Sequence, residues 1–322
     1  MNQKYLEVNV ITYSAIIIAC DKTAQWRQAL QLLREVGERS LQVDLIIYNS
    51  AISACSIASE SRPALQLLGD VAQRKLRPDL ITYNSTLNAC EKAADWLGAL
   101  LLLEELERES VEADVITYSA VIRACGQAAE WQQALQMLCE LTTSQLEADL
   151  INYNSSISSC AKAEVWQAAL EVFNQMLQLH YSPDKITYTA AISTCTDCIQ
   201  WHQALALLQK AKVSSLQLDV IPYNATITAC EKASRWNQAM LLLTSIEENQ
   251  LQADSISFTA AIASCKAAWK WQSALLLLAE VTLRHLKTDV IMDGLVLLAC
   301  EHEHIVARQV LGLLESSSIT VK

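Results

Sequence analysis

Residues 80–114 read LITYNSTLNACEKAADWLGALLLLEELERESVEAD, and this stretch decides the fold. Tyr83, Leu87 and Cys90 recur at steps of four and three residues, which places them on one face of a helix. The second half of the stretch carries apolar side chains at the same helical spacing, at Trp96, Ala99, Leu100 and Leu103. The sequence therefore predicts two helices of about three turns each, joined by a short polar turn.

The same unit recurs along most of the chain at a step of 35 residues. Nine of the eleven cysteines keep this step: Cys20, Cys55, Cys90, Cys125, Cys160, Cys195, Cys230, Cys265 and Cys300. So do an aromatic residue near the start of each unit, from Tyr13 to Phe258, and seven tryptophans, from Trp26 to Trp271. A fixed period of this size indicates a solenoid or a related repeat array.

Each unit closes on an aspartate, and cutting the chain after it gives eight complete units. These units are 10–44, 45–79, 80–114, 115–149, 150–184, 185–219, 220–254 and 255–289. Residues 290–322 form a partial, degenerate ninth unit, and residues 1–9 match the end of a preceding one. The chain thus begins inside a repeat, as expected of a truncated gene model or of a fragment of a longer array.

Neither helix of a unit can bury its apolar face alone, so neighbouring helix pairs must stack. Small residues beside the periodic cysteine, such as Ala89 and Ala124, allow close contact between helices. We therefore expect an all-α fold, an α-solenoid of stacked helix-turn-helix repeats that forms a right-handed superhelix. Only six glycines and four prolines are present, which argues against a loop-rich β-sandwich, a collagen or a disordered chain.

Several function classes find no support in the sequence. The longest apolar runs have six residues, whereas a membrane span needs about 20, so no membrane partner is predicted. Stacked helices lie about 8–10 Å apart, too far for disulfides between cysteines of successive units. Neither the Cys195 and Cys198 pair nor the group of Cys300, His302 and His304 has the surroundings of a redox or metal site. We expect no cofactor, no metal, no small-molecule substrate and no enzymatic activity.

The start of the unit 115–149 reads VITYSAVI, its second helix begins WQQAL, and it ends on Ala148-Asp149. This pattern closely resembles the pentatricopeptide repeat family, of the pure 35-residue type. The resemblance is strong over residues 10–289 and weak over 290–322, and cysteine and tryptophan at two core positions depart from it. It implies a modular binder of single-stranded RNA that contacts one base with each repeat.

In that family the second residue of each repeat packs against the faces of the bases. Here it is always isoleucine, at Ile11, Ile46, Ile81, Ile116, Ile151, Ile186, Ile221 and Ile256. These β-branched side chains suit insertion between bases. The alternative is that they only begin the first helix and pack on the preceding repeat.

The resemblance further implies that the fifth and last residues of each repeat select the base. The fifth residues are Ser14, Asn49, Asn84, Ser119, Asn154, Thr189, Asn224 and Thr259. The last residues are Asp44, Asp79, Asp114, Asp149, Asp184, Asp219, Asp254 and Asp289. Aspartate before a helix is also a good N-cap, but Asn, Ser and Thr inside a helix are unfavourable without a role.

By the family's correspondence, Asn with Asp resembles a uracil-selecting pair, and Thr or Ser with Asp resembles a guanine-selecting pair. Taken parallel to the RNA, the eight units predict a target near 5′-GUUGUGUG-3′. From the third unit on, Asn alternates with Ser or Thr. This alternation suggests duplication of a 70-residue pair of repeats.

The net charge of −11 argues by itself against nucleic-acid binding. Its distribution is less unfavourable, because the first fourteen residues of the complete units hold seven basic and four acidic residues, a net of +3, which leaves −14 elsewhere. Four lysines occupy the thirteenth position, which resembles the family's phosphate contact: Lys22, Lys92, Lys162 and Lys232. The alternative is that they are solvated surface lysines.

Two functions remain. The first is sequence-selective binding of single-stranded RNA in organellar RNA processing, stability or translation, with RNA-processing proteins as further partners. The second is a helical-repeat scaffold that binds a peptide or protein in its concave groove, which the acidic total supports. A nuclease or editing enzyme would need an appended catalytic domain, for which no residues remain. The resemblance implies a mitochondrion or chloroplast, although no targeting peptide is visible.

Overall fold

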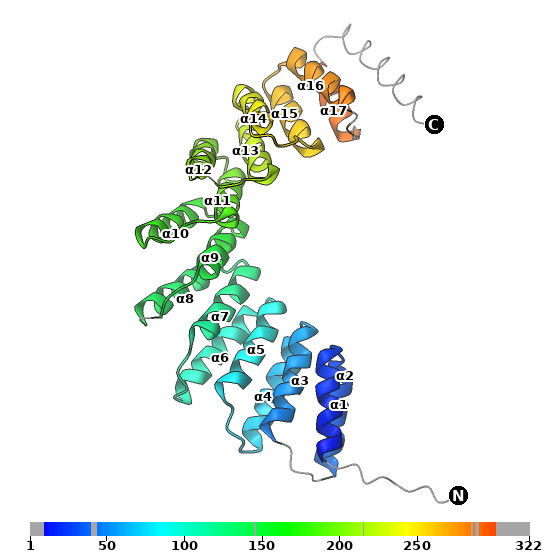
Figure 1. Cartoon of the computed structure of the whole chain (residues 1–322), viewed down its shortest axis with the longest axis vertical. Helices are drawn as coiled ribbons and strands as arrows, with labels where there is room; N and C mark the ends of the chain where they lie inside the picture. The colour runs from blue at the N-terminus through cyan, green and yellow to red at the C-terminus, as the bar shows by residue number, and fades with distance from the viewer. Residues whose placement is uncertain are drawn as a thin grey trace, which may run out of the picture. The chain divides into compact units, whose positions relative to one another are not determined.

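The computed structural model describes residues 10–39, 44–144, 146–214, 216–284, 286 and 290–300. Within these ranges every regular element is an α-helix. The chain divides into two compact units, Met1–Ala163 and Glu164–Lys322. The labels α1 to α17 follow the chain in Figure 1.

In Met1–Ala163, the first helix of each repeat begins at the first residue of the unit predicted from the sequence. These first helices are α1 (Val10–Lys22), α3 (Leu45–Ile57), α5 (Leu80–Lys92), α7 (Val115–Gln127) and α9 (Leu150–Lys162). The second helices are α2 (Trp26–Glu38), α4 (Ser61–Gln73), α6 (Trp96–Arg108) and α8 (Trp131–Thr143).

In Glu164–Lys322, the first helices are α11 (Lys185–Asp197), α13 (Val220–Lys232), α15 (Ser255–Ala267) and α17 (Val290–Ala299). The second helices are α10 (Trp166–Gln178), α12 (Trp201–Val213), α14 (Trp236–Glu248) and α16 (Trp271–Leu283).

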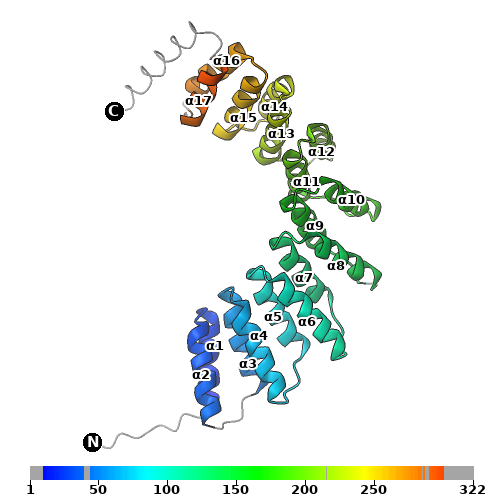
Figure 2. The same ribbon diagram turned by 180° about the vertical axis from the view of Figure 1, so that it is seen from behind.

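The packing is the same in both units. Within each unit, a first helix contacts the first helix of the next repeat, as α3 contacts α5 and α13 contacts α15. The second helices other than α10 pack on their own first helix and on the first helix that follows, as α6 does on α5 and α7, and α10 packs on α11. Figure 1 and, from behind, Figure 2 show the first helices lying side by side within each unit. The prediction of an all-α solenoid is therefore confirmed.

An aspartate caps the N-terminus of each first helix from α3 to α15. The last residue of a repeat has an extended backbone, and its side chain accepts a hydrogen bond from a backbone N–H in the first turn of the next helix. At Asp114, for example, the donor is the N–H of Thr117, at 2.8 Å from Oδ1. Such a cap satisfies a donor that the helix itself leaves unpaired.

The first helices from α1 to α15 are each followed by a residue with positive φ, and none of these residues is glycine. At the end of α5 the φ angle of Ala94 is 54°, and equivalent residues with positive φ follow the other first helices. The N–H of Asp95 donates to the carbonyl of Cys90 at 2.8 Å, and the N–H of Ala94 donates to that of Glu91 at 3.0 Å. These two bonds form a Schellman motif, which fixes the short turn before the second helix.

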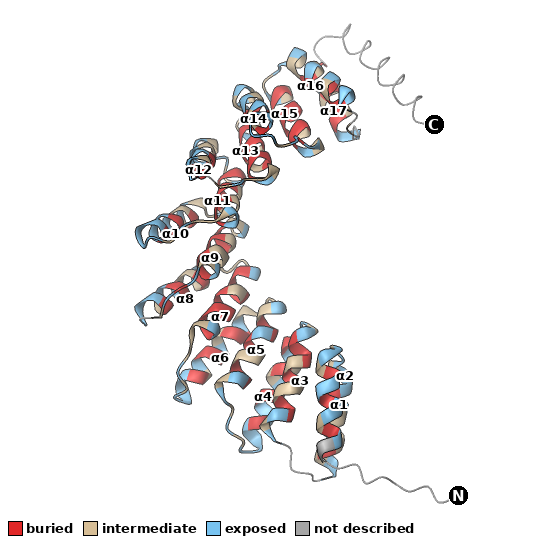
Figure 3. Cartoon of the chain, viewed as in Figure 1, coloured by how far each residue is buried: buried red, intermediate tan, exposed pale blue. Residues whose placement is uncertain are grey.

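The core lies between the helix layers, as the buried residues in Figure 3 show. It contains the aromatic residues at the fourth position, such as Tyr83 and Tyr153, and all nine periodic cysteines, which are buried and free. Burial raises the pKa of the Cys90 thiol to about 12, so this thiol stays protonated. No helix in the described part of the chain has both the length and the apolar character to cross a membrane.

Candidate nucleic-acid interface

A row of isoleucines is exposed along the first helices. The second residue of seven repeats leaves 54 to 65% of its surface accessible, at Ile46, Ile81, Ile116, Ile151, Ile186, Ile221 and Ile256. The side chain of Ile11 lies outside the described residues. More than half of the surface of each of these seven isoleucines faces solvent, so packing on the preceding repeat covers less than half of each side chain. An apolar side chain at the same exposed place in every repeat favours a binding surface.

The predicted fifth and last residues meet most fully around Asn84. Its Nδ2 donates to Asp114 Oδ1 at 3.4 Å, and its Oδ1 accepts from the Thr117 hydroxyl at 2.8 Å. The same hydroxyl also lies 2.8 Å from Asp114 Oδ1. Asn84 is the fifth residue and Asp114 the last residue of one repeat, whereas Thr117 is the third residue of the next repeat. The site is therefore built from two consecutive repeats.

The same arrangement recurs around Asn224, in the second compact unit. Asn224 Nδ2 donates to Asp254 Oδ1 at 3.1 Å, and the Ser257 hydroxyl lies 2.6 Å from Asn224 Oδ1 and 2.8 Å from Asp254 Oδ1. Ser257 again is the third residue of the following repeat. Asn224 is buried, with 9% of its surface exposed.

These hydrogen bonds set the charge state of the aspartates. Partial burial raises the pKa of the Asp114 carboxyl, but bonds from the Thr117 N–H and hydroxyl and from Asn84 outweigh burial and hold the pKa below its ordinary value. At Asp79 and Asp254, too, burial raises the pKa of the carboxyl, but hydrogen bonds outweigh burial and lower the pKa below its ordinary value. These three carboxylates therefore remain charged acceptors at neutral pH.

Asn49 departs from this pattern. The Thr82 hydroxyl lies 2.7 Å from Asp79 Oδ1, but Asn49 Oδ1 is buried without a hydrogen-bond partner among the described residues. A bond from Asn49 still contributes to the lowered pKa of Asp79. The amide nitrogen of Asn49 thus faces the carboxylate as in the other two sites, while its oxygen is unsatisfied.

The hydroxyl residues at the fifth position bond to their own helix. Ser119, Thr189 and Thr259 each donate to the carbonyl four residues earlier, at 2.6 to 2.7 Å. A hydroxyl has one proton, so these oxygens can only accept from a ligand. Ser119 is buried, with 5% of its surface exposed, and is the least accessible of the three.

Asp219 differs from the other capping aspartates. The third residue of the following repeat is Pro222, which has no N–H, and Asp219 Oδ1 accepts from the N–H of Ile221 at 3.2 Å instead. Its Oδ2 forms an ion pair with Lys185 Nζ at 2.8 Å. The base-selecting prediction for Asp219 therefore involves a carboxylate that already has a cationic partner.

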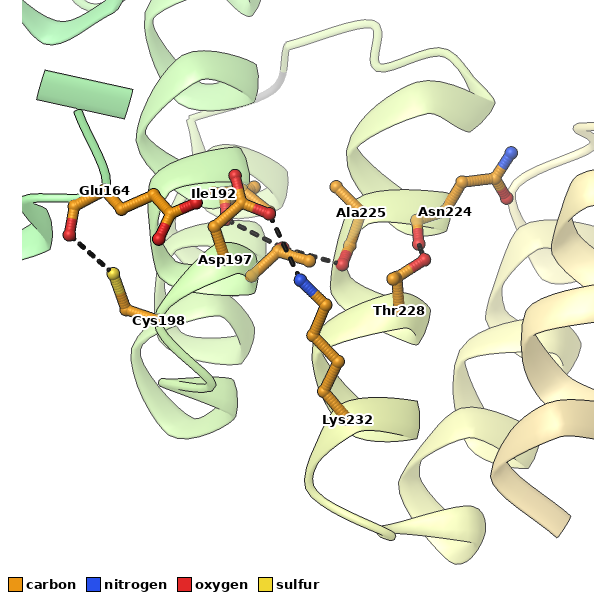
Figure 4. A network of polar contacts seen from close by, with 9 residues as sticks. Glu164, Ile192, Asp197, Cys198, Asn224, Ala225, Thr228 and Lys232 are labelled. Carbon is orange, nitrogen blue, oxygen red and sulfur yellow. Dashed lines mark hydrogen bonds and ion pairs between the residues drawn. The ribbon is translucent and has the colours of Figure 1, made fainter. Parts of the chain in front are cut away.

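The thirteenth-position lysines are all exposed, but two have partners in the preceding repeat. Lys162 Nζ donates to the carbonyls of Gly126 and Gln127 at 3.0 and 3.2 Å. Lys232 Nζ pairs with Asp197 Oδ1 at 3.2 Å, as Figure 4 shows. No protein partner is seen for Lys22 or Lys92 within the described ranges. The mildly basic charge of the first helices is thus partly neutralised within the protein.

Some predicted residues lie outside the described ranges, and one predicted pair is divided between the two compact units. Asp289 lies outside the described residues, and so do His302 and His304. Asn154 lies in the first compact unit and Asp184 in the second. Sequence reasoning did not single out the third residue of the repeat, although its variation along the chain was visible in the sequence.

The fold and this surface define a class of protein: an α-solenoid of 35-residue helical hairpins that presents exposed isoleucines and paired polar residues once per repeat. Family profiles agree with that class. The pentatricopeptide repeat domain matches residues 31–93, the PPR repeat family matches 78–127 and 148–197, and the PPR repeat matches 116–146. Together these matches cover just over half of the chain. The chain belongs to the pentatricopeptide repeat family.

Solved structures of this family have a similar fold. The crystal structure of the pentatricopeptide repeat protein PPR10 from maize aligns with a TM-score of 0.62 and 17% identity, covering 90% of this chain and 47% of that one. The complex of PPR10 with an 18-nt psaJ RNA element aligns at 0.48 and 17% identity, over 98% and 56%. The chain thus spans about half the length of PPR10.

The PPR domain of Arabidopsis thaliana protein-only RNase P 1 in complex with tRNA aligns at 0.49 and 12% identity, over 54% of this chain and 92% of that one. At these identities the likeness concerns the fold. No curated protein matches this chain.

Proposed function

We propose that the first helices form a surface that binds single-stranded RNA and selects one base with each repeat of 10–289. Family membership supports binding of RNA, and the preferred sequence is expected near 5′-GUUGUGUG-3′. In this proposal the isoleucines lie between successive bases, and the fifth and last residues contact base edges. The protein acts as a binder without catalysis of its own.

The observation that carries the proposal is the exposed isoleucine that shares a helix with a polar fifth residue in the seven repeats from 45–79 to 255–289. Ile81 and Asn84 are three residues apart and so share a face of α5. Ile81 offers an apolar surface of 65% exposure, and Asn84 offers hydrogen-bonding groups beside it. A base needs both, because its faces are apolar and its edges carry donors and acceptors.

The two kinds of fifth residue present different groups. Asn84 gives one amide proton to Asp114, which leaves the other N–H for an acceptor such as uracil O4. Thr259 gives its proton to the Ser255 carbonyl, so its oxygen accepts from donors such as the amino group of guanine. Cytosine carries an amino group where uracil has O4, and adenine lacks the 2-amino group of guanine, which supports uracil at Asn repeats and guanine at Ser or Thr repeats.

The affinity contributed by phosphate contacts should be modest. Lys22 and Lys92 are available to phosphates, whereas Lys162 and Lys232 must exchange protein partners for them. Arg123, also on a first helix, is paired with Glu91 at 2.8 Å. Base selection rather than charge is therefore expected to dominate binding.

The proposal is tested by fluorescence anisotropy with labelled RNAs. The octamer GUUGUGUG should bind more tightly than its complement CACACAAC, than poly-A, and than the same octamer in a duplex. Equal affinity for poly-A and the octamer would remove base selection from the proposal. Binding of an acidic or basic peptide with no RNA binding would favour the scaffold function instead.

The proposed setting is a mitochondrion or chloroplast, where pentatricopeptide repeat proteins typically act. There the protein would hold a UG-rich single strand and so affect the processing, stability or translation of a transcript. RNA sequencing after crosslinking in isolated organelles tests this setting, with UG-rich octamers expected at the crosslinked sites.

A further inference from the structure

The third residue of each repeat varies together with the fifth residue of the repeat before it. After the four asparagines Asn49, Asn84, Asn154 and Asn224, the next third residue always carries a hydroxyl: Thr82, Thr117, Thr187 and Ser257. After the four hydroxyl residues Ser14, Ser119, Thr189 and Thr259, it never does: Ile47, Asn152, Pro222 and Met292. The correspondence holds at all eight junctions.

Duplication of a repeat pair does not by itself produce this correspondence. The third, fifth and seventh repeats are all Asn repeats, yet their third residues are Thr82, Asn152 and Pro222. Only Thr82 carries a hydroxyl, and only Thr82 follows another asparagine, Asn49. The third residue therefore follows the preceding repeat rather than its own.

Helix capping does not produce it either. Every described last aspartate caps a first helix, whichever residue stands third. Asp44 caps onto Ile47 and Asp149 onto Asn152 through backbone N–H groups alone. A hydroxyl at the third position is thus not required for the cap.

The hydroxyl contacts the asparagine at the Asn84 and Asn224 junctions, whereas the Thr82 hydroxyl contacts Asp79 and leaves Asn49 Oδ1 without a partner among the described residues. The Thr117 hydroxyl lies 2.8 Å from Asn84 Oδ1, and the Ser257 hydroxyl lies 2.6 Å from Asn224 Oδ1. In each case the amide nitrogen faces the aspartate. An amide held at its oxygen by a donor and at its nitrogen by a carboxylate cannot turn over without placing two acceptors together.

We infer that the third residue of a repeat is a positioning residue for the fifth-position asparagine of the preceding repeat, and that its hydroxyl contributes to uracil selection. This inference rests on the proposed function. The locked amide keeps one N–H pointing at the base, where uracil has an acceptor and cytosine has an amino group. A fifth-position hydroxyl bonds to its own helix and needs no such support.

The test compares uracil with cytosine at single bases of the octamer. Thr117→Val should lower the preference for uracil at the third base about fivefold, the effect of one hydrogen bond, and leave the seventh base unchanged. Ser257→Ala should do the converse, and Thr117→Ser should behave as the parent. The matched control is Thr86→Val, which removes a buried hydroxyl of α5 that bonds only to the Thr82 carbonyl.

A purely structural role would weaken binding of the uracil and cytosine RNAs alike, so the ratio of the two affinities separates the roles. An unchanged ratio in Thr117→Val and Ser257→Ala, with uracil preferred by the parent, overturns the inference and leaves the proposed function standing. A parent without uracil preference at either base overturns the proposed function itself.

A gain-of-function pair completes the test at the fourth base. Ser119→Asn places an amide at the fifth position of the fourth repeat. Adding Asn152→Thr supplies a hydroxyl at the third position of the fifth repeat. The double variant should prefer uracil over cytosine about fivefold more strongly than Ser119→Asn alone. Equal ratios for the two variants would contradict the inference.

Discussion

Replacing the amide with a hydroxyl at two repeats should change the bound sequence at two bases. In Asn84→Thr with Asn224→Thr, each new hydroxyl can donate to the carbonyl four residues earlier, as Thr189 does at 2.7 Å. Every last aspartate stays in place. The preferred RNA should move from GUUGUGUG toward GUGGUGGG, with no change at the other six bases.

The structure also gives the cost in stability. Asn84 loses a 2.8 Å bond from Thr117 and a long 3.4 Å bond to Asp114, together about 1 kcal/mol. Asn224 loses bonds of 2.6 and 3.1 Å, together about 2 kcal/mol. The thermal melt followed by circular dichroism should therefore shift down measurably. Asn88→Thr, at an exposed place on α5, is the matched control and should shift little.

The assay is competition with octamers that differ from the parent site at one base at a time, because G-rich RNAs fold on themselves. Each matched base should be worth about 1 kcal/mol or more, since an unpaired buried donor or acceptor costs about 1–3 kcal/mol. The reasoning is refuted if the double variant still prefers uracil at both the third and the seventh base. The asparagines would then be structural.

Three further outcomes are expected. Ala94→Gly should raise the free energy of unfolding by up to about 1 kcal/mol, because φ at Ala94 is 54°; a lower melting temperature would contradict this. Phosphate contacts by Lys22 and Lys92 alone give a slope of log affinity against log salt of about −1.4, and contacts by all four lysines bring it to about −3, at ~0.7 per contact. Asp197→Ala should strengthen binding at low salt by releasing Lys232; unchanged binding would exclude that lysine. Native thiol titration should detect only Cys139 and Cys198 readily, since the other described cysteines are buried, whereas denaturation without reductant should release nearly all eleven cysteines.

Much of the fold could be predicted from the sequence because the period repeats each local signal. The steps between Tyr83, Leu87 and Cys90 define one helix, and the Asp79 cap marks its start. Buried, separate cysteines followed from helix spacing alone and are confirmed. Local chemistry determines these features, so one repeat suffices to predict them.

The candidate site could be predicted only in part because its contacts cross from one repeat to the next. The period places Asn84 on one first helix and Asp114 directly before the next first helix. It does not indicate which oxygen of Asp114 caps that helix. It also does not indicate that Lys232 turns to Asp197, or that Ser119 is buried. Those outcomes depend on how far one hairpin is displaced against the next, which helical spacing within a repeat does not determine.

In the proposed function, the junction between repeats, rather than the single repeat, is the element that selects the base. Asn84 lies in one repeat and Thr117 in the next, and Asp114 serves both, because its Oδ1 caps α7 and accepts from the Asn84 amide. Copying one Asn repeat behind itself would create a new junction whose third residue was fitted to a different neighbour. Copying a pair also creates one new junction, but there an Asn repeat follows a Ser or Thr repeat, so the alternation of Asn with Ser or Thr is what duplication by pairs would preserve. Thr82 carries a hydroxyl at the one junction where two Asn repeats are adjacent, but that hydroxyl bonds to Asp79 and leaves Asn49 Oδ1 without a partner among the described residues.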